Sequence, residues 1–177
     1  APAGFDFETG VHCGLCLPQV APSAARFTVA MRYSAAESDP RTLLSVNTGQ
    51  ANNMIFLSEA DGLLTAKDRG NGISAELRAP LRGAEPHLAV VSFTGRSLIL
   101  SLDGRGTTVE GRAAGMDLPA DLFIGCRSTR SGLHKTLGAA RIHDVIFWPD
   151  RALLHSDAPA DHACRQALDR YHRWSMR

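Results

Sequence analysis

The sequence predicts an all-β protein with a single short α-helix at its C-terminal end. Apolar stretches are separated by turn signals roughly every eight to twelve residues, which is the spacing of a β-sandwich. Within the stretches apolar and polar side chains alternate, as in a strand with one buried face. His87–Gly104 shows this most clearly, because two apolar strands meet at Thr94–Arg96 and the second runs into an Asp-Gly turn.

About eleven strands follow from the pattern. Phe5 and Phe7 share one face of a short opening strand, and the rest of residues 1–25 is expected to be an irregular lead-in because it contains Pro18 and Pro22. The remaining strands are expected at residues 26–34, 42–47, 53–58, 63–67, 73–77, 87–93, 98–102, 107–112, 121–127 and 138–148.

Residues 156–175 break the strand pattern and are expected to form the C-terminal helix. Ala163, Ala167, Tyr171 and Trp174 fall at helical steps of four, four and three, so they line one face. We expect this face to pack on the sandwich. A helix that presents the same face to a partner protein is the alternative.

Length and composition describe one ordinary globular domain, which is expected to span residues 1–177. The 177 residues are 44% hydrophobic and 21% charged, enough for a sizeable core. The formal net charge of +1 provides no global field that would attract nucleic acid. No apolar run approaches the roughly 18 residues that span a bilayer, so no membrane insertion is expected.

The four cysteines leave free thiols, disulfides and a metal site open as alternatives. Cys13 and Cys16 have the CxxC spacing of a zinc half-site or a redox pair, whereas Cys126 and Cys164 stand apart in the sequence. Nitrogen ligands for a zinc ion could come from His12 and His162.

Four segments carry a resemblance to a known family. They are His87–Val91, Leu98–Gly104, Leu122–Gly125 and Ala140–Trp148. Their order resembles the concanavalin A-like lectin domains of the laminin G type, and the residues after the last segment look like the C-terminal helix of the bacterial and phage members. The resemblance covers about residues 26–174. It implies a jelly-roll sandwich of two antiparallel sheets, in which Gly125 permits a close backbone approach.

The superfamily also contains glucanases, whose catalytic strand carries Glu-x-Asp-x-x-Glu. The nearest match here is Glu59-Ala60-Asp61, but the third carboxylate is absent and Asp61 lies in an expected Asp-Gly turn. No G-x-S-x-G elbow, HExxH motif or P-loop occurs either. We therefore expect no enzymatic activity, with a glycoside hydrolase as the weaker alternative.

Loops rather than strands are expected to carry a ligand site. Arg127–Lys135 is the most ligand-like stretch, since its cations could contact an anionic sugar or a protein. Trp148, Tyr171 and Trp174 are expected to be structural, which leaves Tyr33 as the aromatic candidate for stacking on a sugar. The candidate carbohydrate contacts are Asn52, Asn53, Arg127, Arg130, His134 and Lys135. A solvated basic loop is the alternative.

The resemblance also raises the question of calcium, which many laminin-G-type members bind at an edge of the sandwich. Calcium takes six to eight oxygen ligands in proteins. Asp68–Gly72 is the best single loop, and Asp68 and Asn71 are the candidate ligands. The alternative is that these residues only form a turn, held by local hydrogen bonds. No other cofactor is expected.

The sequence thus predicts a non-catalytic, lectin-like recognition domain. Its partner is expected to be a cell-surface glycan, and its place is outside the cell or on a virion, within a larger secreted or phage-type assembly. The alternative is a structural module that docks on or decorates a larger particle and binds no sugar. Both hypotheses remain open because a fold does not specify a function. An oligomer is compatible with either of them.

Overall fold

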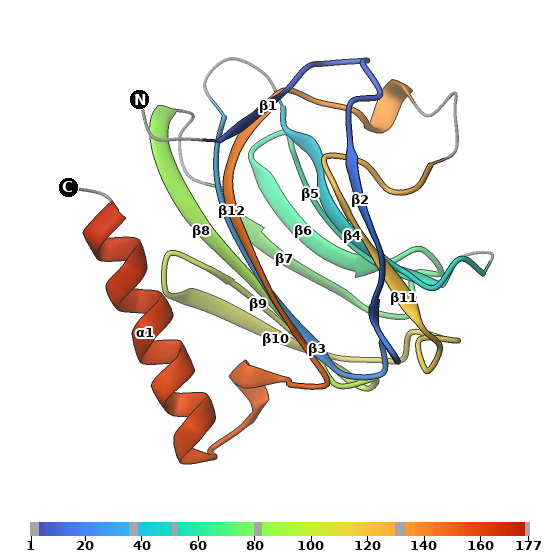
Figure 1. Ribbon diagram of the computed structural model, residues 1–177, viewed down its shortest axis with the longest axis vertical. Coiled ribbons are helices and arrows are strands. Elements are labelled where there is room, and N and C mark those ends of the chain that lie inside the picture. Colours follow the sequence, from blue (N-terminus) through green and yellow to red (C-terminus); the bar gives the residue numbers. More distant parts are fainter. Residues whose placement is uncertain (1–3, 36–38, 51–52, 80–82, 130–133, 176–177) are drawn as a thin grey trace.

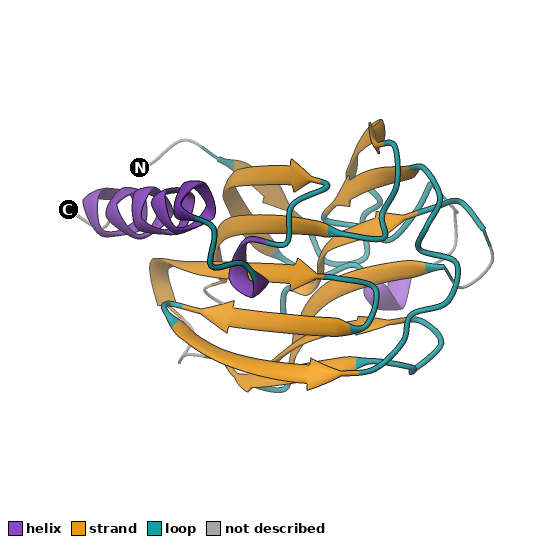
Figure 2. Cartoon of the chain, turned by 90° about the horizontal axis from the view of Figure 1, so that it is seen from below, coloured by secondary structure: helices purple, strands orange, loops and turns teal. Residues whose placement is uncertain are grey.

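This computed structural model describes residues 4–35, 39–50, 53–79, 83–129 and 134–175. Two six-stranded antiparallel sheets pack face to face (Figure 1), and helix α1 (Pro159–Ser175) lies outside them (Figure 2). In spatial order, sheet A contains β1 (Phe5–Phe7), β12 (Ala140–Pro149), β3 (Phe27–Ala35), β8 (Gly83–Phe93), β9 (Ser97–Leu102) and β10 (Arg105–Glu110). Sheet B contains β2 (Leu15–Ala21), β11 (Ala120–Ile124), β4 (Arg41–Asn47), β5 (Met54–Ala60), β6 (Leu63–Asp68) and β7 (Ser74–Arg78). The predicted jelly-roll sandwich with a C-terminal helix is confirmed.

The predicted central hairpin lies in sheet A. Leu98, Leu100 and Leu102 on β9 are fully buried, because alternate side chains of a strand face the same side. Asp103 and Gly104 both adopt positive φ, 50° and 81°, as the two-residue turn between β9 and β10 requires. The hairpin predicted from alternation and from the Asp-Gly turn is therefore confirmed.

The N-terminal segment departs from the prediction of an irregular lead-in. The predicted short opening strand is confirmed as β1, which pairs with β12, but the expected irregular stretch contains a second strand, β2, which pairs with β11. The described residues form twelve strands in all. Most β2 side chains are exposed, which removes the alternation by which a strand is recognised in a sequence. Pro18 is tolerated in β2 because it is an edge strand.

One polar contact crosses the core between the sheets. The hydroxyl of Tyr33 on β3 donates to Glu59 Oε2 on β5 at 2.6 Å, and the two residues are 1% and 5% exposed. Burial raises the pKa of the Tyr33 hydroxyl, and the charge of Glu59 raises it further. Tyr33 is therefore a core residue, and the prediction that it stacks on a sugar is wrong.

Gly125 has the structural role that was expected of it. Its φ is +73°, in the left-handed region that favours glycine. A Cβ at this position would collide with the ring of Phe7 on β1. This close approach allows the end of β11 to lie against the opening strand of the other sheet.

Helix α1 packs on sheet A with a different face from the predicted one. Leu168, 8% exposed, belongs to a small apolar cluster with side chains of β3 and β8. Ala163 and Ala167 are exposed, and Trp174 is 71% exposed, so the prediction that these residues line the buried face is wrong. No helix in the described part of the chain is long and apolar enough to cross a membrane.

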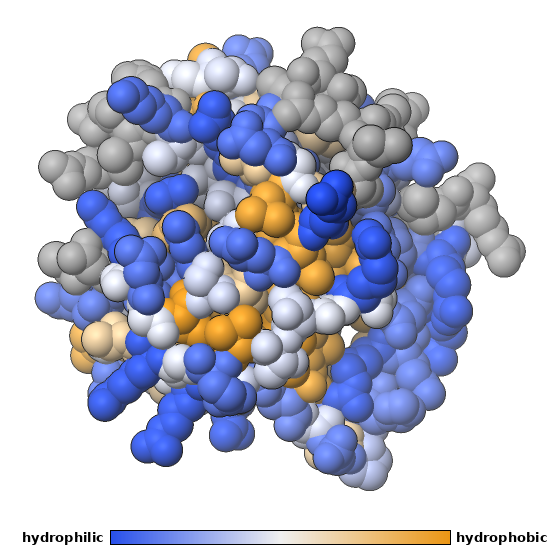
Figure 3. All heavy atoms as spheres, turned by 180° about the vertical axis from the view of Figure 1, so that it is seen from behind, coloured by the Kyte–Doolittle hydropathy of each residue, from blue (hydrophilic) through white to orange (hydrophobic). Residues whose placement is uncertain are grey.

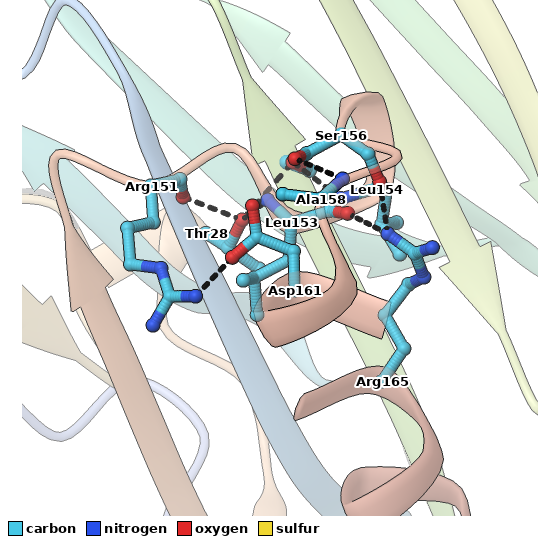
Figure 4. A network of polar contacts seen from close by, with 9 residues as sticks. Thr28, Arg151, Leu153, Leu154, Ser156, Ala158, Asp161 and Arg165 are labelled. Atoms are coloured by element: carbon cyan, nitrogen blue, oxygen red, sulfur yellow. Dashed lines mark hydrogen bonds and ion pairs between the residues drawn. The ribbon is translucent and has the colours of Figure 1, made fainter. Parts of the chain in front are cut away.

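Polar contacts around the first turns of α1 explain this rotation (Figure 4). Arg165 donates to the carbonyl oxygens of Leu153 and Ser156, the latter at 2.6 Å. Arg151, which follows β12, forms an ion pair with Asp161 in the first turn of the helix. These contacts turn Asp161 and Arg165 toward the sandwich, and Leu168 then falls on the buried side.

Candidate ligand-binding face

One cross-strand row of side chains runs over the outer face of sheet B. Its members are directly paired with one another across neighbouring strands, and on the three middle strands β5, β4 and β11 their strand neighbours are buried in the core. We call them the sheet B row; in spatial order they are Lys67 on β6, Phe56 on β5, Ser45 on β4, Phe123 on β11 and Cys16 on β2.

Arg127, just after β11, lies over this row. Its guanidinium carbon is 3.8 Å from the centre of the Phe56 ring, and its Nε donates to Thr42 Oγ1 at 2.9 Å. Its backbone carbonyl accepts a bond from the Asn47 side chain at 3.0 Å. Lys67 Nζ lies 5.8 Å from the centre of the same ring. Phe56 is thus the centre of a patch that holds two cations by cation–π contact.

The patch carries positive charge that no ion pair among the described residues neutralises. Burial lowers the pKa of the Arg127 guanidinium, and the nearby charge of Arg69 lowers it further. Within the described part of the chain, no Asp or Glu forms an ion pair with Arg127, Lys67 or Arg69. An arginine stays charged under such conditions. The patch therefore favours an anionic ligand.

Ser45 adds an unusual feature to the middle of the row. It lies between Phe56 and Phe123, is fully buried, and its hydroxyl has no hydrogen-bond partner among the described residues. A buried hydroxyl without a partner costs about 1–3 kcal/mol in general.

The six predicted carbohydrate contacts fall in different places. Arg127 lies on the patch, whereas Asn53 packs its side chain against Gly115, where a Cβ would collide with it. Lys135 is exposed in the short 3-10 helix η1 (His134–Thr136), which also contains His134. Asn52 and Arg130 lie outside the described residues. Of the predicted residues with a described side chain, only Arg127 is seen to contact a member of the sheet B row, Phe56.

The two predicted calcium ligands lie in the turn between β6 and β7. Asp68 is 5% exposed, and its two oxygens accept the backbone N–H groups of Ile73 at 2.9 Å and Gly70 at 3.0 Å. Asn71 adopts a φ of +57° in the same turn. Among the residues that the structure describes, no three His, Cys, Asp or Glu side chains are placed to hold one metal ion.

The nearest match to a glucanase motif does not form a carboxylate pair on a face. Glu59 is buried in the core on Tyr33, while Asp61 adopts a φ of +52° in the turn between β5 and β6. A retaining hydrolase needs two carboxyl groups about 5 Å apart on either side of the bond to be cleaved. The arrangement of Glu59 and Asp61 offers no such site to a polysaccharide.

Two polar hollows at one end of the sandwich are the rivals of the patch. Both reach Thr94, in the turn between β8 and β9. One has a volume of about 290 Å³ and includes Arg96 and Arg112 in its lining, and the other, about 280 Å³, includes Arg151 and His155. Binding sites are commonly concave, so an experiment must distinguish these hollows from the sheet B row.

No protein-family model matches the chain, and no curated protein matches it in sequence.

Several solved structures have the same fold. Domains LG4-5 of the mouse laminin α1 chain superpose with a TM-score of 0.63 at 17% identity, covering 83% of this chain and 43% of that one. Human galectin-16 gives 0.53 at 12%, covering 78% and 97%. A family 7 alginate lyase, A1-II′ in complex with substrate, gives 0.52 at 12%, covering 73% and 63%. The chain therefore has the concanavalin A-like jelly-roll fold, of the type found in laminin LG domains.

Proposed function

We propose that this chain is a non-catalytic, lectin-like recognition domain that binds an anionic cell-surface glycan on the outer face of sheet B. One observation carries the proposal: the Arg127 guanidinium is held 3.8 Å above the Phe56 ring with no carboxylate partner among the described residues. An arginine fixed on an aromatic ring is pre-organised for an external anion, because its planar fork matches a carboxylate or a sulfate group.

The bonds that Arg127 already makes support this role. Its Nε is used by Thr42, and its terminal nitrogens remain to donate to a ligand. Lys67 and Arg69 add positive charge nearby, which suits a chain of repeated anionic sugars better than a single monosaccharide. The fold is shared with an alginate lyase in complex with its substrate, which makes a polyuronate a reasonable probe.

The direct test measures the binding of the full chain to soluble alginate and to laminarin, a neutral glucan, by calorimetry. We expect alginate to bind and laminarin not to bind. Arg127→Ala should lower the affinity for alginate at least tenfold, and Lys67→Ala should lower it severalfold, since each removes one cation from the patch. Equal binding of both polymers, or no binding of either, would contradict the proposal.

Two further variants show where binding occurs. Arg105→Ala removes an exposed arginine from β10 on sheet A and should leave the affinity unchanged. Arg112→Ala removes a cation from one of the polar hollows. If Arg112→Ala weakens alginate binding and Arg127→Ala does not, the hollow is the binding site and the patch is not. The calcium site at Asp68 and Asn71 stays a prediction. Repeating the calorimetry in the presence of EDTA tests it.

The absence of catalysis is part of the proposal. It is supported by the burial of Glu59 on Tyr33, which leaves the nearest motif match without an accessible acid. Alginate and laminarin should keep their size distribution on long incubation with the full chain. The appearance of shorter products, reduced in a Glu59→Gln variant that still folds, would show that the chain is an enzyme.

A structural docking module is the second candidate, and exposed apolar side chains favour it. Seen from behind, apolar side chains gather in the middle of one face with hydrophilic ones around them (Figure 3). Independently of that view, four exposed large apolar residues belong to the N-terminal segment and its edge strand β2: Phe5, Val11, Leu15 and Leu17. A module of a secreted or virion-type particle would bury such residues in its assembly. Retention of the chain on a particle after Leu15→Ser and Leu17→Ser together would count against this candidate.

A further inference from the structure

Three of the four cysteines meet at the end of the sheet B row, although Cys126 stands far from the CxxC pair in the sequence. Cys16 lies directly opposite Phe123 across the pairing of β2 with β11. Cys126 follows β11 and packs in one apolar cluster with Phe123 and Leu137. All the cysteines are free thiols in this structure. Cys164 belongs to α1, on the other sheet.

Gly14 shows how close the thiols are. A Cβ on Gly14 would collide with the sulfur and the Cβ of Cys126, so this side chain occupies the place where a residue-14 side chain would stand. Gly14 directly precedes β2, and the charges of Cys16 and Cys13 both act on the Cys126 thiol, that of Cys16 more strongly. The Cys126 sulfur therefore lies near the start of β2, with Cys16 as its stronger thiol neighbour.

We propose that Cys16 and Cys126 form a disulfide when the protein meets a low-molecular-weight disulfide such as oxidised glutathione. Cys16 is exposed and Cys126 is buried, so in this pair the small disulfide meets Cys16 first. Its thiolate attacks the small disulfide, one S–S bond breaks, and a mixed disulfide and one small thiol result. The Cys126 thiolate then attacks the Cys16 sulfur and releases the second small thiol. Two protein thiols are oxidised, one small disulfide is reduced to two thiols, and the balance is complete.

The environment of Cys126 makes the second step slow and its product durable. The pKa of the Cys126 thiol is raised to about 11, mainly by burial and also by the charges of Cys16 and Cys13. Little thiolate is present at neutral pH, so closure should accelerate roughly tenfold per pH unit between pH 7 and 9. A thiol with a high pKa is also a poor leaving group, so the closed disulfide resists exchange.

The disulfide would join the edge strand β2 to the segment that carries Arg127. It closes a covalent ring from residue 16 to residue 126, and such a long ring constrains the unfolded state. This inference does not depend on the proposed glycan binding, because it concerns the thiols alone.

The test incubates the full chain with oxidised glutathione at pH 8 and maps the cross-linked peptides after digestion. We expect one link, Cys16 to Cys126, and two remaining thiols by titration. Cys16→Ser and Cys126→Ser should each abolish the link, while Cys164→Ser and Cys13→Ser should leave it intact. Four free thiols after long oxidation, or a link from Cys13 to Cys126, would overturn the assignment.

Two measurements keep the result interpretable. Each variant is first shown to unfold cooperatively, so that a misfolded Cys126→Ser protein is not mistaken for one that lacks the link. Oxidation of the wild-type chain should raise its Tm, and reduction should reverse the rise. An unchanged Tm in a fully cross-linked sample would show that the link exists but does not hold β2 in place.

Discussion

Arginines on the two sheets differ in whether a carboxylate of the described chain neutralises them. On sheet A, Arg32 is 6% exposed and its Nε donates to Asp144 at 2.8 Å, and Arg151, which follows β12, is paired with Asp161 of α1. On sheet B, Arg127 has an aromatic ring and a hydroxyl as neighbours and no carboxylate among the described residues. A buried charge that is matched inside the chain serves the fold, whereas one that is left unmatched remains for another molecule.

The largest effect on stability should come from sheet A. Arg32→Ala leaves Asp144 without its ion pair and removes the guanidinium that lies 5.6 Å from the centre of the Tyr171 ring. Since Asp144 is about one-third exposed, we expect a loss of about 2 kcal/mol in the free energy of unfolding, less than for a fully buried pair. Urea titration measures it, with Arg105→Ala as the control. A loss below that of Arg127→Ala would remove the contrast between the faces.

Compared with Arg32→Ala, Arg127→Ala should lower the free energy of unfolding less and the affinity for alginate more. It removes one hydrogen bond to Thr42 and one stacking contact with Phe56, which together are worth about 1 kcal/mol at a half-buried site. The same urea titration gives the loss in stability, and alginate calorimetry gives the loss in affinity. If the affinity for alginate falls in proportion to the free energy of unfolding in both Arg32→Ala and Arg127→Ala, Arg127 acts on binding only through the fold.

Introducing a carboxylate beside Arg127 should give it an ion pair like that of Arg32 on sheet A. In Lys67→Glu a carboxylate stands beside Phe56, in reach of the Arg127 guanidinium. We expect a small gain in stability, about 0.5 kcal/mol, and an affinity for alginate reduced more than in Lys67→Ala. Lys67→Gln separates the loss of the lysine from the gain of the acid. Equal affinities of the Glu and Gln variants would show that the patch does not select anions.

The smallest effect concerns Asp103, in the turn of the central hairpin. Burial alone would raise the pKa of Asp103, but the bonds from His87 and from the Leu88 amide, together with the charges of His87 and His172, outweigh it and lower the pKa. A carboxyl with a lowered folded pKa contributes stability above its unfolded value, near pH 4, and that stability is lost as the pH falls further. Asp103→Asn should therefore flatten the stability curve below pH 4. An unchanged acid slope in urea titrations from pH 2.5 to 7 would contradict this.

Local patterns explain which parts of the fold could be predicted. Alternation placed Leu98, Leu100 and Leu102 on one buried face, because a single strand decides which side chains point together. The Asp103-Gly104 turn was predicted because only its own backbone conformation is required. Strand β2 escaped prediction since its exposed side chains leave no alternation to detect.

The candidate site could be predicted only in part, because it depends on contacts between distant segments. Arg127 was predicted from the basic composition of its loop, but the ring beneath it, Phe56, looks like any other core residue of a strand in the sequence. Cys126 seemed isolated because only the pairing of β2 with β11 brings it to Cys16. The prediction that the helix face ending at Trp174 is buried was wrong for the same reason, because contacts with residues outside the helix set its rotation.

The pairing of the first strands with the last ones has a consequence for how the chain reaches its native state. Phe5 of β1 stands opposite Ile142 of β12, and Cys16 of β2 stands opposite Phe123 of β11, so both sheets are completed by contacts of very high sequence separation. Such topologies have a high contact order and fold slowly. During synthesis, β1 and β2 leave the ribosome first and must wait for β11 and β12 before they can pair. The N-terminal strands thus stay unpaired during most of synthesis.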